Sequence, residues 1–201
     1  MENPSFMQQW KLVSKSANYW IIFLPPLLVT VLITWMILNK IYPYDAKLIV
    51  PRNDVLVTKN LLEEIALYVT WGFCFGCLVR YLYSKDKFFL WASGMMMVIF
   101  IREIHPPISR VGVYIALIAL FYLAYRKHHI VADYVRSRYL VTLLGTGFFT
   151  YVISVTTDER VWMFIPGEMI FHTKMEETME ILGHISIGCA LLFVRKKPAK
   201  N

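Results

Sequence analysis

Six stretches of apolar, uncharged residues alternate with short polar connections along the chain. The first run has the roughly 18 to 20 residues that a membrane-spanning helix needs, and the fifth run comes close. The other four have 14 or 15 uncharged residues, a length that also suits a re-entrant segment. One soluble core cannot bury so many apolar runs, so the pattern predicts that lipid surrounds them. The runs are Tyr19–Leu38, Ile65–Val79, Phe88–Ile101, Val111–Tyr125, Tyr139–Val155 and Ile181–Val194.

This pattern predicts an all-α, polytopic integral membrane protein whose six transmembrane helices form a single domain over residues 1–201. In an alternative arrangement, the third and fourth helices form a re-entrant hairpin, which leaves the orientation of the other helices unchanged. A Pro25-Pro26 pair inside the first run predicts a kink or a helix restart there.

The two ends of the chain carry their own signals. Within residues 1–18, the apolar side chains of Phe6, Trp10 and Val13 recur at helical spacing among polar residues. This spacing predicts a short amphipathic helix that lies in the cytoplasmic membrane interface. Residues 195–201 are rich in lysine and predict a basic cytoplasmic tail.

Two longer connections, 40–61 and 157–176, are predicted to be loops on the outer side. The first contains two β-branched-rich stretches around a Pro-Arg-Asn-Asp turn within Lys47–Thr58, which predicts a small β-hairpin. The second contains the apolar stretch Val161–Phe171, broken by a Pro-Gly pair. That stretch is interpreted as a second hairpin or as a segment lying in the membrane interface.

Charge sets the expected orientation in the membrane. Hydrophobic residues make up 57% of the chain and charged residues 17%, and the net charge is +7. Thirteen Lys and Arg fall on the side that holds both termini and eight on the other, so both termini are predicted to be cytoplasmic. Because these basic residues flank apolar runs, we expect them to orient helices and not to bind nucleic acid. A bacterial inner membrane is the expected location.

Charged residues inside three of the predicted helices share one depth. Glu64, Arg102 and Glu180 each lie 15 or 16 residues from the nearest basic residue at the cytoplasmic end of the helix. At a rise of ~1.5 Å per residue, this places all three about 22 to 24 Å across the membrane. The hydrocarbon core is roughly 30 Å thick, so they lie below the outer headgroups.

An isolated charge at this depth costs about 2.5 to 3.5 kcal/mol, so groups of opposite sign are expected to meet. We therefore predict a buried charge cluster around Arg102 in the outer leaflet. His105 lies slightly further out than this cluster. The predicted members are Glu64, Arg102, Glu103, Glu177, Glu180 and His184.

A structural role explains some of these carboxylates equally well. Asn60-x-x-Glu63 and Thr173-x-x-Glu176 both resemble capping boxes at helix starts. Glutamates in a first helical turn also complement the helix dipole. Glu180 lies further inside its helix, where capping does not explain it.

The same residues include candidate metal ligands. Glu180-x-x-x-His184 places two side chains on one helix face, and Glu103-x-His105 and Glu64 complete a possible oxygen and nitrogen site. Such a set suits a divalent or transition metal such as iron, manganese or zinc, although neither spacing is diagnostic.

The small and sulfur-containing residues predict packing. Cys74 and Cys77 have the spacing of a redox motif but lack its βαβ context, and Gly72 and Gly76 in the same helix suit close helix contacts. Gly145-x-Gly147 is interpreted in the same way.

Three functions remain open from the sequence. The first is a channel- or transporter-like protein in which the Glu/Arg/His cluster gates or relays protons or ions. The second is a non-catalytic structural, sensing or assembly subunit of a membrane complex. The third is a metal-dependent enzyme acting on a lipid-soluble substrate at the outer leaflet. Besides the lipid bilayer, a homo-oligomer or another membrane protein is the expected partner, because 201 residues leave little room for a large cavity.

Overall fold

A computed structural model gives the fold. Of the segments 47–52, 55–60, 109–110 and 168–171 the backbone alone is described. The amphipathic helix predicted near the N-terminus and His105 fall outside the described part of the chain. The structure describes residues 11, 14–15, 17–39, 41, 47–52, 55–104, 109–165 and 168–196.

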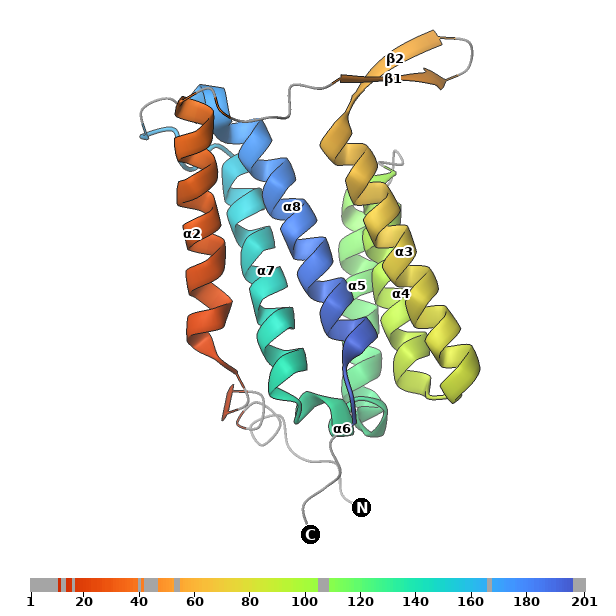
Figure 1. Ribbon diagram of the computed structural model, residues 1–201. Coiled ribbons are helices and arrows are strands. Elements are labelled where there is room, and N and C mark those ends of the chain that lie inside the picture. The colour runs from red at the N-terminus through yellow and green to blue at the C-terminus, as the bar shows by residue number, and fades with distance from the viewer. Residues whose placement is uncertain are drawn as a thin grey trace.

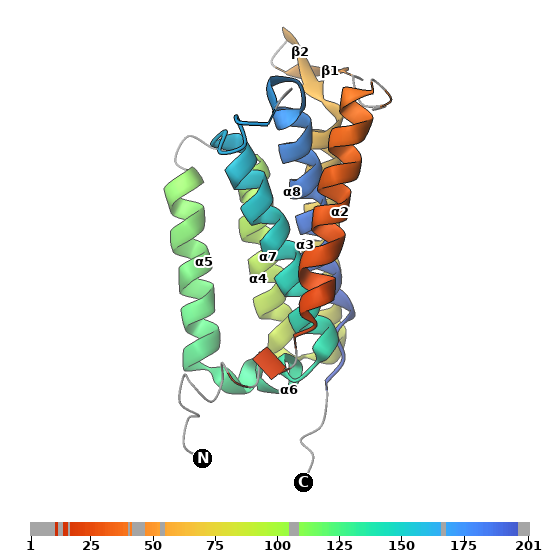
Figure 2. The same ribbon diagram turned by 90° about the vertical axis from the view of Figure 1, so that its left-hand side faces the viewer.

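Six long helices stand side by side in the described part of the chain, each antiparallel to the next in sequence (Figures 1 and 2). Two short helices, η1 (His128–Ile130) and α6 (Ala132–Val135), cross one end, which we call the α6 end. The opposite end carries a small sheet and is called the hairpin end. The long helices are α2 (Tyr19–Leu38), α3 (Leu61–Ser84), α4 (Lys87–Glu103), α5 (Ser109–Arg126), α7 (Arg138–Asp158) and α8 (Glu168–Phe193).

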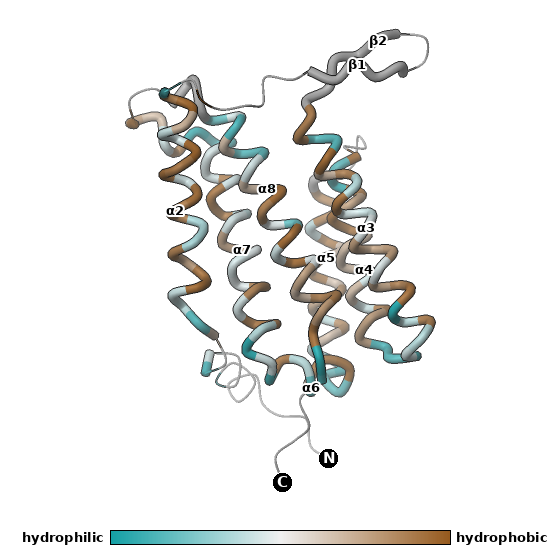
Figure 3. The backbone as a smooth tube through the Cα atoms, in the orientation of Figure 1, coloured by the Kyte–Doolittle hydropathy of each residue, from teal (hydrophilic) through white to brown (hydrophobic). Residues whose placement is uncertain are grey.

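The helices are those of a membrane protein. Three of them, α2, α3 and α7, are long and apolar enough to cross a bilayer, and Val111–Arg126 of α5 is a shorter apolar helix. Apolar residues recur along the helices between the two ends (Figure 3). Helix α2 continues through Pro25 and Pro26 as one element and does not restart there.

The outer connections differ from each other. Strands β1 (Lys47–Arg52) and β2 (Val55–Asn60) pair antiparallel, over the stretch for which the sequence predicts a hairpin. The expectation of a loop over 157–176 is wrong for much of its length, because α7 ends at Asp158 and α8 begins at Glu168. Buried Met175 and Met179 pack this polar start of α8 against its neighbours, so the helix extends well beyond its uncharged run.

The apolar core lies mainly near the α6 end, where α3, α4, α7 and α8 meet. Phe88 and Met96 of α4 are fully buried there, and the Phe88 ring stacks on Tyr134 of α6 with the ring centroids 3.8 Å apart. A smaller core near the hairpin end joins α2, α7 and α8 through Ile33, Ile153 and Met179. The polar side chains described below lie between these two cores.

Glycines allow α7 and α8 to approach closely. A Cβ at Gly147 would collide with the Ile187 side chain and approach the Gly183 carbonyl to 3.1 Å, and a Cβ at Gly183 would lie 2.8 Å from Thr150 Oγ1. The packing role predicted for Gly147 is therefore confirmed. Gly72 differs, since nothing lies within 4 Å of a Cβ placed there.

A second polar group holds the α6 end together. Asp86 caps the start of α4, where its Oδ1 accepts a hydrogen bond of 3.0 Å from the Phe88 N–H. Its Oδ2 accepts a 2.6 Å bond from the Tyr134 hydroxyl and lies 2.7 Å from Lys196 Nζ. Partial burial opposes ionisation, but the Lys196 ammonium and the donated hydrogen bonds outweigh it, so the pKa of Asp86 lies below its ordinary value.

Replacing Gly147 by alanine is expected to lower the free energy of unfolding by about 1 to 3 kcal/mol, because the new methyl group overpacks the contact with Ile187. Thermal unfolding in detergent measures the effect. Gly72→Ala is the matched control, and its melting temperature should equal or exceed that of the wild type. Equal melting temperatures for the two variants would contradict the close contact.

Asp86→Asn is expected to cost about 1 kcal/mol of stability at neutral pH, through weaker capping of α4 and the lost charge pair. A carboxylate whose pKa is lowered by folding stabilises the folded state at pH values above its ordinary pKa, which is 3.8 here. This stabilisation is lost as the pH falls below that value. The difference between wild type and variant should therefore be constant between about pH 5 and 7 and shrink below about pH 4. Denaturation at several pH values measures it, and a difference that grows on acidification would exclude this account.

Candidate functional site

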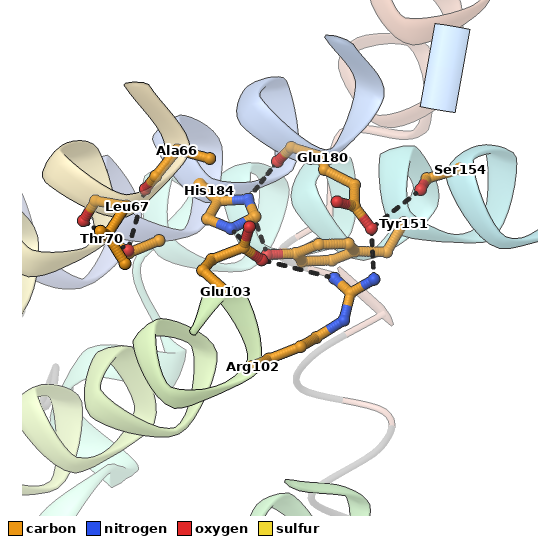
Figure 4. A network of polar contacts seen from close by, with 9 residues as sticks. All are labelled: Ala66, Leu67, Thr70, Arg102, Glu103, Tyr151, Ser154, Glu180 and His184. Atoms are coloured by element: carbon orange, nitrogen blue, oxygen red, sulfur yellow. Dashed lines mark hydrogen bonds and ion pairs between the residues drawn. The ribbon is translucent and has the colours of Figure 1, made fainter. Parts of the chain in front are cut away.

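Four charged or titratable side chains from α4 and α8 meet toward the hairpin end (Figure 4). Arg102 Nη2 pairs with Glu180 Oε1, and Arg102 Nη1 lies 3.8 Å from Glu103 Oε1. The same Glu103 oxygen lies 3.0 Å from Nε2 of His184. The predicted meeting of Arg102 with Glu103 and Glu180, with His184 beside them, is therefore present in the structure.

Helix geometry places these groups. Arg102 and Glu103 occupy the last turn of α4, where a cation complements the helix dipole. Glu180 and His184 are four residues apart on α8, so they lie on one face, one turn apart. Burial differs sharply along the cluster: the Arg102 side chain is 34% exposed, Glu103 is 5% exposed and His184 is completely buried.

Helix α7 adds two members that the sequence analysis missed. The Tyr151 hydroxyl lies 3.1 Å from Nδ1 of His184, and Ser154 Oγ donates a 3.3 Å hydrogen bond to Glu180 Oε1. The Arg102 guanidinium lies 5.8 Å from the centroid of the Tyr151 ring. A signal for Ser154 exists in the sequence, because polar residues recur every four positions along this helix and lie buried. They are Thr142, Thr146, Thr150 and Ser154.

The main chain of α8 selects the tautomer of His184. Nδ1 contacts the carbonyl oxygen of Glu180, which can only accept a hydrogen bond, so this contact favours the tautomer with the proton on Nδ1. Nε2 then faces the Glu103 carboxylate at 3.0 Å. Two lone pairs at this distance repel each other, so a further proton lies on one of these two groups.

This second proton has two places to reside. On Nε2 it makes an imidazolium paired with the Glu103 carboxylate, and on Glu103 it makes a neutral acid beside a neutral ring. The carboxylate oxygen lies at ion-pair distance but off the direction of a straight hydrogen bond from Nε2. The Glu103–His184 contact is thus a buried pair of an imidazole and a carboxyl group that share one proton.

An acidic pocket of about 150 Å³ adjoins the pair. Five glutamates line it, including Glu103 and Glu180 of the cluster, and Thr173 contributes a hydroxyl. The pocket therefore connects the buried pair with the polar starts of α3 and α8. The lining residues are Leu62, Glu63, Ala66, Glu103, Thr173, Glu176, Glu177 and Glu180.

One expectation needs correction here. Glu63 lines the pocket and Glu64, a predicted member of the charge cluster, does not, because neighbouring residues on a helix point about 100° apart. The capping box expected at Thr173-x-x-Glu176 is wrong, since α8 begins at Glu168 and Glu176 lies more than two turns inside it. Glu177 lines the pocket as a neighbour of Glu180.

The metal prediction gains no support from the arrangement. Within the described residues, no three His, Cys, Asp or Glu side chains are grouped so that they could hold a metal ion. The Arg102 guanidinium already supplies the positive charge between Glu103 and Glu180. Cys74 lies buried with its Sγ 3.5 Å from Ser93 Oγ, which agrees with a packing role.

No known protein family, curated protein or solved structure matches the chain. The function therefore rests on the geometry of the cluster and its pocket.

Removing one partner of the partly buried ion pair should be more costly than removing both. Arg102→Met leaves the Glu180 carboxylate without its cation and should lower the free energy of unfolding by about 1 to 3 kcal/mol. The double variant Arg102→Met/Glu180→Met should recover most of this loss. Chemical denaturation in detergent measures the two values. Additive losses in the double variant would show that the two side chains are not coupled.

Proposed function

We propose that this chain is a small multi-pass membrane protein that relays protons through the Glu103–His184 pair, as a channel- or transporter-like protein does. The observation that carries the proposal is the buried His184 ring, held at Nδ1 by the Glu180 carbonyl and facing the Glu103 carboxylate at Nε2. Buried titratable groups inside a membrane protein are costly and commonly mark proton pathways.

The pocket supports a route to the pair from the hairpin end. Glu63, Glu176 and Glu177 line its wall, and Glu103 is shared between the pocket and His184. Carboxylates at such an entrance attract protons and bring them within reach of the buried pair. Arg102 holds Glu180 and Glu103 in place and balances their charge.

Beyond His184 the route is closed in this conformation. The next turn of α8 presents Ile187, and Leu191 follows it; both are fully buried in the core near the α6 end. Protons therefore reach His184 from one side, and passage to the other side requires the helices to move. This arrangement favours a gated carrier over an open pore.

The proposed topology has six membrane-spanning helices. Helices α4 and α5 are continuous elements of 17 and 18 residues, long enough for about 26 Å each, which favours two spans over a re-entrant hairpin. The cationic connections gather at the α6 end, where α2 begins and α8 ends (Figure 1). We therefore place both termini in the cytoplasm and the acidic pocket outside, in a bacterial inner membrane.

A structural role in a membrane complex is the second candidate. It is favoured by the pairing of Arg102 with Glu180 and Glu103 with His184, since such pairs join α4 to α8 without any transported ion. The apolar faces of α5, including Ile115 and Ile118, are exposed and suit lipid, a second copy or another membrane protein. In this case the cluster stabilises the bundle, and the protein moves no protons.

Proton flux into liposomes tests the proposal. Purified protein is reconstituted, a membrane potential is imposed, and a pH-sensitive dye inside the vesicles reports proton entry. The wild type should carry protons, and Glu103→Gln and His184→Gln should each reduce the rate by about tenfold or more, because each removes one of the two groups between which the proton is exchanged.

Glu159→Gln is the matched control, because this exposed glutamate of the α7–α8 connection lies outside the cluster and should leave flux unchanged. Melting temperatures show whether each variant remains folded. Wild-type vesicles without flux above that of empty vesicles would exclude the proton relay and leave the structural role.

A further inference from the structure

One guanidinium group ties the end of α8 to its neighbours. Arg80 of α3 donates a hydrogen bond to the carbonyl oxygen of Leu192, in the last turn of α8, and another of 2.9 Å to that of Val194, which follows the helix. Carbonyl groups at a helix end have no donor within the helix, so this pairing supplies the donors that they need. The same guanidinium lies 4.1 Å from the centroid of the Phe89 ring. Arg80 therefore joins α3, α4 and α8 at the α6 end.

Residues 194–196, which we call the C-terminal strap, continue from α8 toward α6 (Figure 1). Lys196 Nζ lies 2.7 Å from Asp86 Oδ2, and the same oxygen accepts the hydrogen bond of the Tyr134 hydroxyl. Asp86 is the N-cap of α4, and Tyr134 belongs to α6. The strap therefore links the end of α8 to the start of α4 and to α6.

The strap also covers the apolar core near the α6 end. Val194 is completely buried and belongs to the same apolar cluster as Cys77 and Leu191. This cluster lies between His184 and the α6 end, so its cover decides whether water reaches His184 from that side. At the hairpin end, by contrast, the acidic pocket adjoins Glu103.

We infer that Arg80 and the C-terminal strap form a gate, which keeps the α6 end closed while the acidic pocket is accessible from the hairpin end. The inference rests on the proposed function, in which protons reach the buried pair from one side at a time. Helix α8 carries both His184 and the strap. A movement of its end that opens the core below His184 therefore breaks the contacts with Arg80 and Asp86.

These contacts suit a gate because they can break and form again. The Lys196 side chain is 56% exposed, and an ion pair at such a site adds little to stability, since water replaces it readily. Arg80 contributes more, because one guanidinium serves two carbonyl groups. Water at the membrane surface can satisfy the same groups once the end of α8 moves away. The closed and open states therefore differ by a free energy small enough for both to be populated.

Labelling of Cys77 tests the gate, because this thiol is completely buried and lies one turn from Arg80 on α3. The chain has three cysteines, so Cys74→Ala/Cys189→Ala leaves Cys77 as the only thiol. This background protein is placed in lipid nanodiscs and treated with a water-soluble maleimide. Labelling should be about threefold faster after Lys196→Gln and about tenfold faster after Arg80→Gln. Equal rates in the background and both variants would overturn the gate.

Two controls separate an open gate from a general loss of stability. Lys196→Arg keeps the cation and should label as slowly as the background. Ile33→Ala removes part of the core near the hairpin end, so it should lower the melting temperature and leave labelling slow. If Ile33→Ala accelerated labelling as much as Arg80→Gln, the label would report stability and the gate would be refuted.

Labelling does not depend on proton movement, so the gate and the proton relay can fail separately. Faster labelling of the two gate variants in a protein that carries no protons would support the closed α6 end and exclude the relay. Unchanged labelling in a protein that carries protons would exclude the gate alone.

Discussion

Charge buried within a membrane bundle has to be neutralised by other protein groups, and the middle of this molecule is arranged around that requirement. Arg102 at the end of α4 pairs with Glu180 of α8, and Glu103 faces His184. Removing either partner leaves a charge in a medium of low dielectric constant, which is far more costly than at a protein surface. The close contact of α7 with α8 then brings Tyr151 within hydrogen-bonding distance of His184.

The two ends of the bundle carry opposite charge. Glutamates from α3, α4 and α8 line the pocket toward the hairpin end, whereas the α6 end has exposed cations such as Arg136 and Arg138, and Asp86 there is engaged by Lys196. This asymmetry is consistent with the proposed uptake of protons from the hairpin end. The apolar core between His184 and the α6 end keeps the two sides apart.

Much of this arrangement follows from the sequence, because matching depth and opposite sign predicted that Arg102 and Glu180 meet. Depth does not fix helix rotation, so the sequence did not identify Glu63 as a residue that lines the pocket. The apolar runs are defined by the absence of charge, so they also contain neutral polar residues. Tyr151 lies within such a run and was therefore not recognised as a member of the cluster. The same definition placed the start of α8 too late, since its first turns are polar and are held by Met175 and Met179 through tertiary packing.

The protonation of His184 tests the central claim most directly. Solid-state NMR of histidine-labelled protein in bilayers resolves the two ring nitrogens, and His184→Gln identifies the signal. The account predicts a ring that carries a proton on Nδ1, where the Glu180 carbonyl accepts its hydrogen bond. A neutral ring protonated at Nε2 and bare at Nδ1 would contradict it, because such a ring donates nothing to the Glu180 carbonyl and needs no shared proton.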